Sequence, residues 1–412
     1  MAVLSAAVVE FAYNENVVFS LAQNQQERVQ AYFLAVSAIN FTKLILKADK
    51  EVKGFAKSAN KQYGTNIKIP PLYELVPLNT FLLRQAASMG VGETIPTLPP
   101  EDTATPSASG SPLGDMQKGV NLFDPKVMEQ FLAFEGDFAA VVTEEEAKIN
   151  LNAFYQLNPK QKEYLRLRRI LFFLLASEEF KDFFSNRLKD AEDLAGNIAD
   201  FIDRDDLSNG LQGEELGPER SKYQDPNRRP KNGKLISLEE LLLVEGMNDD
   251  LFEKLKNHVT IYGKDGKILA CRANESIIKA MILAYVEGDP RVQGISMDNK
   301  ELLDKAVMAA QTACPDVTAM TTNVDTALGI VSATTTPTGP KPPPATGATT
   351  PPTTASAAFG SMIKTDGFVY TVIGTGALGE DLDRQTKVNI RVVLDTTEKI
   401  PAHWKLLYWR VE

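Results

Sequence analysis

Acidic side chains crowd the stretch between residues 200 and 215, and they are the most specific chemical feature of the sequence. The acids are Asp200, Asp203, Asp205, Asp206, Glu214 and Glu215. Carboxylates at alternate positions in a loop with glycine and asparagine place several oxygens around a hard cation such as Ca²⁺. An EF-hand is excluded, because a glycine at the sixth position and a glutamate at the twelfth do not occur together. The open alternative is that these acids are solvated turn formers at the end of a helix.

A hydrolase is a second interpretation of the same acids, because glycosidases use two carboxyl groups. One carboxyl of such a pair lies in an apolar pocket that raises its pKa. A run this rich in acids is expected to stay solvated and ionised instead. We therefore expect no catalytic residue here, and we expect that the chain is not an enzyme.

Two glycine motifs resemble nucleotide or DNA sites. Gly374-Thr-Gly376-Ala-Leu-Gly379 fits G-x-G-x-x-G after a strand, but another strand follows within ten residues where a dinucleotide fold needs a helix. We interpret these glycines as a hairpin turn that needs positive φ. Gly246 before a helix resembles half of a helix-hairpin-helix, but acids at that helix start oppose a phosphate. A DNA-binding protein therefore remains only an alternative.

The composition narrows the class of protein further. The 412 residues carry a net charge of −10, which argues against nucleic acid as a partner. Cys271 and Cys314 are the two cysteines, so a disulfide between them is open and a zinc site of several cysteines is excluded. The two histidines, His258 and His403, are expected to be structural or surface residues.

The N-terminal part of the sequence predicts one long helix. From Ala6 to about Lys57 there is no proline, the one glycine is Gly54, and apolar residues recur at helical spacing. Because no uninterrupted apolar run of 18 residues exists, this stretch is not expected to span a membrane as it stands. It resembles the end of a longer apolar segment.

The rest of the sequence predicts an α+β architecture, in which a sheet begins before a helical block and is completed after it. Strands are expected near Asp137 and Ala147, and again over 367–375, 387–395 and 404–411. Ser237-Leu-Glu-Glu240 is a capping box that opens a helix. The expected parts are a helix over 1–60, the first part of a head over 61–157 with a loop at 96–115, an inserted helical domain over 158–310, a low-complexity linker region over 311–360, and closing strands over 361–412.

Five places in this order resemble the K-type minor pseudopilin of type II secretion, also called general secretion pathway protein K. The five are Glu27–Ala35 on the long helix, Lys148–Ala153 (KINLNA), Phe201–Tyr223 with its acids, Asn232–Met247 with its N-G…E-L…V-x-G-M pattern, and the C-terminal strands. The fourth place is the most specific.

The resemblance implies a pilin-like fold, in which a long N-terminal helix packs on an antiparallel sheet and a large all-α domain is inserted. It implies a structural subunit that caps the pseudopilus tip, with partners of the I and J types, in protein export across the outer membrane. It also implies a single-pass inner-membrane protein with its bulk in the periplasm, whose anchor is incomplete in this chain. Calcium is bound near the acidic loop in this family.

The calcium ligands that we predict are Asp203, Asp205, Asp206 and Glu215. Asp203, Asp205 and Glu215 match the family pattern, whereas Leu216 replaces its last aspartate. The sequence also departs from the family at Leu269–Ala273, which stands where the family has N-V-N-T-A, and in the threonine- and proline-rich tether at 334–356.

Overall fold

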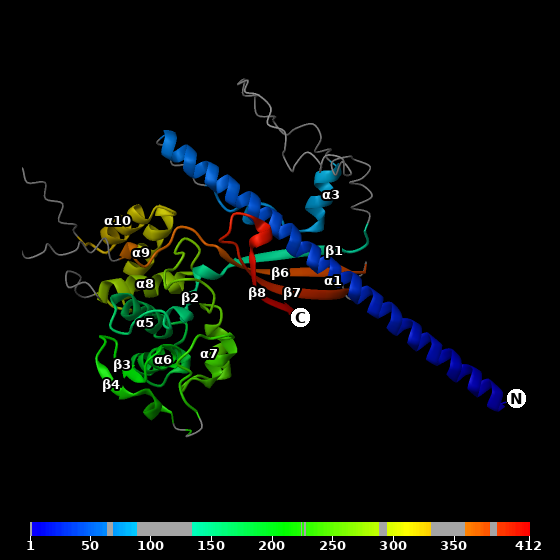
Figure 1. The fold of residues 1–412 in the computed structure, drawn as a ribbon, viewed down its shortest axis with the longest axis horizontal. Coiled ribbons are helices and arrows are strands. Elements are labelled where there is room, and N and C mark those ends of the chain that lie inside the picture. The colour runs from blue at the N-terminus through cyan, green and yellow to red at the C-terminus, as the bar shows by residue number, and fades with distance from the viewer. Residues whose placement is uncertain are drawn as a thin grey trace, which may run out of the picture. The chain divides into compact units, whose positions relative to one another are not determined.

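The computed structural model describes residues 2–63, 69–88, 134–223, 225, 228–287, 295–330, 359–379 and 385–412. The chain forms two compact units (Figure 1). Unit 1 comprises Met1–Thr143 and Thr371–Glu412, and unit 2 comprises Glu144–Tyr370. Unit 2 is thus inserted, in sequence, into unit 1. The predicted loop at 96–115 and the low-complexity tether at 332–358 lie outside the described residues.

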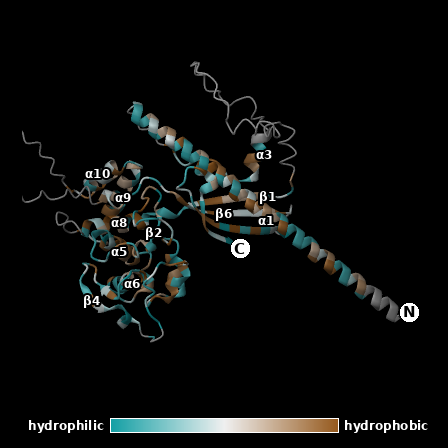
Figure 2. Cartoon of the chain, in the orientation of Figure 1, coloured by the Kyte–Doolittle hydropathy of each residue, from teal (hydrophilic) through white to brown (hydrophobic). Residues whose placement is uncertain are grey.

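Helix α1 (Ala2–Tyr63, 62 residues) is the largest element of unit 1 and is longer than the roughly 50 residues expected. Its middle buries one face, because Ala31, Ala35 and Ile39 recur at helical spacing and pack on the sheet. Large apolar side chains such as Phe11 and Phe19 are exposed nearer the N-terminus. Figure 2 shows hydrophobic and hydrophilic residues interspersed along α1. By length and composition, Glu10–Tyr63 is the one helix in the described part of the chain that could cross a membrane. The expectation that this stretch does not span a membrane is therefore not supported, because polar residues interrupt its apolar run but leave it apolar enough on average.

The sheet of unit 1 has the strand order β1-β6-β7-β8. Its strands are β1 (Asp137–Glu144), β6 (Val369–Leu378), β7 (Thr386–Asp395) and β8 (Lys405–Val411). Strands β7 and β8 are antiparallel, with Ile390 opposite Val411. Val388, Ile390 and Val392 alternate toward α1 and form a core with Ala31 and Ala35. The predicted α+β pilin-like fold, a long helix on a sheet, is confirmed.

Gly374 and Gly376 allow α1 to approach β6 closely. A Cβ at Gly374 would lie 2.6 Å from the backbone oxygen of Ala35, and one at Gly376 would overlap that of Ala31. Both glycines lie inside β6, and in the G-x-G-x-x-G motif only Gly379 has a positive φ, of 112°. The turn interpretation is therefore wrong for the first two glycines, whose role is to let a helix backbone contact a strand.

Replacing Gly376 by alanine is expected to destabilise unit 1 by about 2 kcal/mol, because the added methyl group forces the helix away from the strand. Both tryptophans, Trp404 and Trp409, lie in unit 1, so tryptophan fluorescence during urea unfolding measures this unit. Gly54→Ala is the control, because nothing lies within 4 Å of its Cβ position. Alanine in that helix should stabilise unit 1 by about 1 kcal/mol. Equal unfolding of the two variants would contradict the packing role.

Short elements complete unit 1. They are α2 (Leu72–Leu75), α3 (Thr80–Ser88) and the 3₁₀ helix η7 (Pro401–His403). Thr80 accepts a hydrogen bond from the backbone nitrogen of Phe138, with 2.9 Å between nitrogen and oxygen, and Arg84 pairs with Asp137 at 3.0 Å. These contacts join α3 to the start of β1.

Unit 2 is mainly helical and is built around one large apolar core. Its helices are α5 (Lys162–Leu175), α6 (Arg187–Ile202), α7 (Asp249–Leu255), α8 (Glu275–Glu287), α9 (Lys300–Ala313) and α10 (Val317–Ala327). Helix α10 lies in the stretch expected to be linker. Threonines weaken its helical signal, but Asp316 caps its start by accepting from the backbone nitrogens of Thr318 and Ala319.

Two small sheets and several 3₁₀ helices connect the helices of unit 2. Strand β2 (Ile149–Asn150) pairs in parallel with β5 (Val259–Thr260), and β3 (Leu207–Asn209) pairs antiparallel with β4 (Glu215–Pro218). The 3₁₀ helices are η2 (Glu145–Ala147), η3 (Leu151–Ala153), η4 (Lys181–Phe183), η5 (Glu219–Lys222) and η6 (Leu238–Leu243). The capping box at Ser237 and Glu240 is confirmed, but the helix that it opens is the short η6.

The two cysteines form a disulfide, Cys271–Cys314, with a sequence separation of 43. It joins the segment before α8 to the junction between α9 and α10, and the Met320 sulfur lies 3.9 and 4.0 Å from its two sulfurs. The pairing that the sequence left open is therefore present. His258 is buried and structural, because its ring contacts Glu179 and Asn274.

Candidate metal centre

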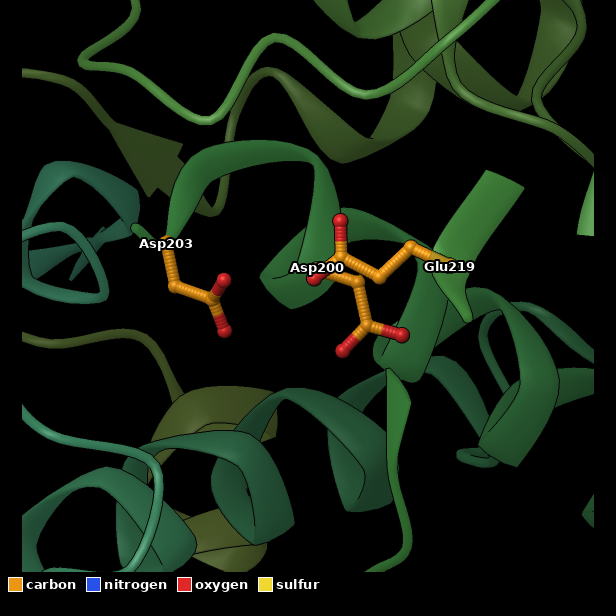
Figure 3. Close-up of side chains that lie close together, drawn as sticks. All are labelled: Asp200, Asp203 and Glu219. Atoms are coloured by element: carbon orange, nitrogen blue, oxygen red, sulfur yellow. The ribbon is translucent and has the colours of Figure 1, made fainter. Parts of the chain in front are cut away.

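Three carboxyl groups of unit 2 converge where helix α6 ends. Asp200 lies in its last turn, Asp203 is its C-terminal cap, and Glu219 opens η5. The hairpin of β3 and β4 brings Glu219 back, and its backbone nitrogen donates to Asp206 O with 3.1 Å between the two atoms. Oxygens of the three carboxyl groups lie within 4.8 Å of one another, and Figure 3 shows the three side chains close together. We call these three residues the acid trio.

The acid trio is buried and short of hydrogen-bond donors. Asp200, Asp203 and Glu219 are 2%, 0% and 1% exposed. Tyr164 donates its hydroxyl to Asp203 Oδ2, at 2.5 Å between oxygens, and Lys222 Nζ lies 3.0 Å from Asp200 Oδ2. Asp200 Oδ1, Asp203 Oδ1 and both oxygens of Glu219 have no hydrogen-bond partner. Buried unpaired carboxylates are costly, so these four oxygens fit the ligands of a cation.

Burial and mutual repulsion raise the pKa values of two members. The pKa of Asp203 is raised to about 7, chiefly by burial and then by the charges of Asp200 and Asp205. The pKa of Glu219 is raised to about 9, again chiefly by burial and then by Asp203 and Asp200. Burial and Asp203 also raise the pKa of the Tyr164 hydroxyl. Asp203 and Glu219 therefore hold protons strongly unless a cation replaces them.

The charges of the trio suit a divalent cation. Three carboxylates and the Lys222 ammonium sum to −2 when all are ionised. Calcium prefers carboxylate and carbonyl oxygens and tolerates irregular geometry. The residues present therefore fit Ca²⁺, with Asp200, Asp203 and Glu219 as the side chains that would hold it.

Of the four ligands predicted from the sequence, only Asp203 belongs to the acid trio. Asp205 Oδ1 accepts from the backbone nitrogen of Leu207, at 2.8 Å. Asp206 is exposed and accepts from Asn232, and the exposed Glu215 pairs with Lys160 at 2.9 Å. The charges of Asp205 and Asp206 still reach Glu219, whose pKa they raise. The four-ligand set remains a prediction.

Sequence reasoning did not place Asp200 and Glu219 in the candidate site. Asp200 was detectable, because it lies three residues before Asp203 and so shares its face of the helix. Glu219 had no local signal, since a hairpin brings it to the site. Within the ranges that the structure describes, the trio is the one group of three or more metal-type side chains.

The helix after Gly246 offers no phosphate site. Helix α7 has seven residues, and Asn248 caps it by accepting from the backbone nitrogen of Leu251. Asp249 and Asp250 occupy its first turn. Negative charges there repel an anion, so nothing in this turn favours the DNA-binding alternative.

The comparisons with known proteins identify the inserted unit. Residues 147–264 match the family described as "Type II secretion system (T2SS), protein K". The chain carries a protein K domain of type II secretion. The matched residues contain three of the five places of resemblance, including Asn232–Met247. They also contain all three residues of the acid trio. The resemblance to protein K recognised from the sequence is thereby confirmed over this domain, and it supports the role of a minor pseudopilin, a structural component of that system.

No curated protein matches the chain. A chain in the crystal structure of the GspK-GspI-GspJ complex from enterotoxigenic Escherichia coli is similar to this protein, with 17% sequence identity and a TM-score of 0.41. The match covers 68% of this chain and 80% of that chain. At this distance the likeness does not define the family of this chain, which rests on the match to the protein K model.

Proposed function

We propose that this minor pseudopilin caps the tip of the type II secretion pseudopilus and acts without catalysis in protein export across the outer membrane. The match of the protein K family to unit 2 carries the proposal. The insertion supports it, because a unit of 227 residues, Glu144–Tyr370, interrupts the sheet-forming part of the chain. Such bulk on a pilin-like subunit would oppose the stacking of further subunits above it.

The partners that we propose are minor pseudopilins of the I and J types. A chain similar in part to this one was crystallised in a complex named GspK-GspI-GspJ. In unit 1, the N-terminal part of α1 leaves Phe11, Tyr13 and Phe19 more than 60% exposed. Exposed aromatic side chains on a helix are suited to pack against helices of partner subunits.

We propose an inner-membrane location with the bulk of the chain in the periplasm. The apolar part of α1 supports attachment to the membrane. The disulfide between Cys271 and Cys314 supports an oxidising compartment, where such bonds form and persist. Calcium in the acid trio is part of the same proposal, supported by its four buried oxygens without partners.

Co-expression with the I- and J-type pseudopilins of the same secretion system tests the tip assignment. The full chain should co-purify with both partners at equal stoichiometry. Replacing the exposed Phe11 and Phe19 by serine should weaken co-purification at least about tenfold, because the apolar contact is lost. The control is Leu188→Ser, which changes an exposed leucine of unit 2. A chain that assembles equally well with the J-type partner absent or with both phenylalanines changed would contradict the proposal.

A further inference from the structure

Lys222 places an ammonium group against the acid trio. It ends η5, three residues after Glu219, so both side chains leave the same face of this 3₁₀ helix. Its Nζ lies 3.0 Å from Asp200 Oδ2. The Lys222 side chain is 26% exposed, whereas that of Asp200 is 3% exposed. The lysine therefore reaches from solvent to a buried carboxylate.

Gly196 makes room for two cationic side chains beside helix α6. A Cβ at Gly196 would lie 2.5 Å from Arg168 Nη2 and 3.7 Å from Lys222 Nζ. Arg168 is 2% exposed, and its Nη1 donates to Gly210 O with 3.0 Å between the atoms. Of these two cations, Arg168 is held inside the unit, whereas the flexible side chain of Lys222 can move its ammonium group into solvent.

We propose that Lys222 is a displaceable counter-ion of the cation site and sets the calcium concentration at which that site fills. This inference rests on the calcium site of the proposed function. In protein without calcium, the ammonium neutralises one carboxylate of the trio. When Ca²⁺ enters, the carboxylates contact the stronger charge, and the ammonium turns out into solvent.

Competition for the same carboxylate and repulsion between the two cations explain why both are not held equally. With Lys222 in place the trio sums to −2, so a divalent ion would balance the remaining charge, but it would also have to share Asp200 with the ammonium, which lies 3.0 Å from Asp200 Oδ2. Like charges a few ångströms apart repel strongly in a buried site. Lys222 can leave because its ammonium is a point charge on a rotatable stem, held in an ion pair with Asp200. Calcium must therefore break that ion pair, which weakens its apparent affinity.

The test compares the full-length protein with Lys222→Met, which keeps the apolar stem and removes the charge. Calcium chloride is titrated into chelator-stripped protein by isothermal calorimetry. We expect the Kd for calcium to fall about tenfold in Lys222→Met, because binding no longer breaks an ion pair. Lys222→Arg, which keeps the charge, should retain an affinity near that of the wild type.

Thermal melting supplies a second readout, in which the effect of Lys222→Met on the melting temperature depends on calcium. Without calcium, Lys222→Met should melt below the wild type, because the trio has lost a neutralising charge. At saturating calcium the variant should melt at the same temperature as the wild type or above it. The matched control is Lys279→Met in the same unit, a lysine 32% exposed that pairs with Glu275 and Asp304. Its melting temperature should change equally with and without calcium.

Two results would overturn the inference in distinguishable ways. If the wild type binds calcium and Lys222→Met binds it equally or more weakly, with its disulfide formed and its circular dichroism unchanged, then Lys222 is an ordinary structural partner of Asp200. If neither protein binds calcium, the cation site itself fails and the inference fails with it. Lys222→Gln serves as a second variant should Lys222→Met be unfolded without calcium.

Discussion

Protein stripped of calcium should lose stability in unit 2 as the pH rises from 5 to 8, and saturating calcium should abolish most of that loss. The reason is the acid trio. Raised pKa values of about 7 for Asp203 and about 9 for Glu219 mean that the folded unit binds protons more strongly than the unfolded chain does. Stability of this origin is complete below the ordinary carboxyl pKa and falls as the pH rises through the raised values.

The expected size follows from linkage. A group that is protonated when folded and ionised when unfolded contributes a slope of about 1.4 kcal/mol per pH unit. Asp203 alone then accounts for about 3 kcal/mol between pH 5 and pH 7. Glu219 adds to the loss and extends it toward pH 9. Calcium reverses the effect because it binds the ionised carboxylates and stabilises the folded unit by mass action.

Urea unfolding followed by far-UV circular dichroism, at four pH values with and without calcium, measures this prediction. Tryptophan fluorescence reports unit 1, so a transition seen by dichroism alone belongs to unit 2. In the double variant Asp203→Asn with Glu219→Gln, the stability of unit 2 should depend little on pH and little on calcium. This variant retains both histidines. Glu215→Gln changes a ligand predicted from the sequence that lies outside the acid trio. It should leave the pH dependence and the calcium dependence of stability as in the wild type. Stability of the stripped wild type that is flat or rises with pH would contradict the role of the trio.

The sequence predicted the elements that depend on local pattern. The long helix follows from the absence of proline and the helical spacing of apolar residues, and it holds over α1. The cap at Ser237 follows from a side chain that bonds the start of its own helix. The strand at Asp137 and the three strands of the C-terminal part are also where the sequence places them.

The sequence did not predict features that depend on contacts between distant residues. Gly374 and Gly376 look like turn residues until the backbone of α1 is seen to lie against them. Glu219 enters the acid trio only because a hairpin with a register shift folds back to the end of α6. The same acids in an open loop would be solvated, so burial decides between a ligand and a surface charge, and burial cannot be read from spacing.

Removal of the disulfide should cost unit 2 about 4 kcal/mol. The bond closes a loop with a separation of 43 residues, and a closed loop of that length removes this much conformational entropy from the unfolded chain. The variant to compare is Cys271→Ala with Cys314→Ala, which leaves no thiol. Urea unfolding at saturating calcium, followed by circular dichroism, measures the loss without interference from the acid trio.

The loss of stability without the disulfide should be concentrated in the helices next to the bond. Cys314 lies between α9 and α10, and Cys271 precedes α8, so the bond ties this helical pair to the rest of the core. Hydrogen exchange in the double variant should accelerate most in α9 and α10, because local opening now needs no bond to break. Dithiothreitol should destabilise the wild type to the level of the variant and leave the variant unchanged. Unchanged exchange in α9 and α10 would mean that apolar packing, with Met320 at its centre beside the two sulfurs, holds the pair without the bond.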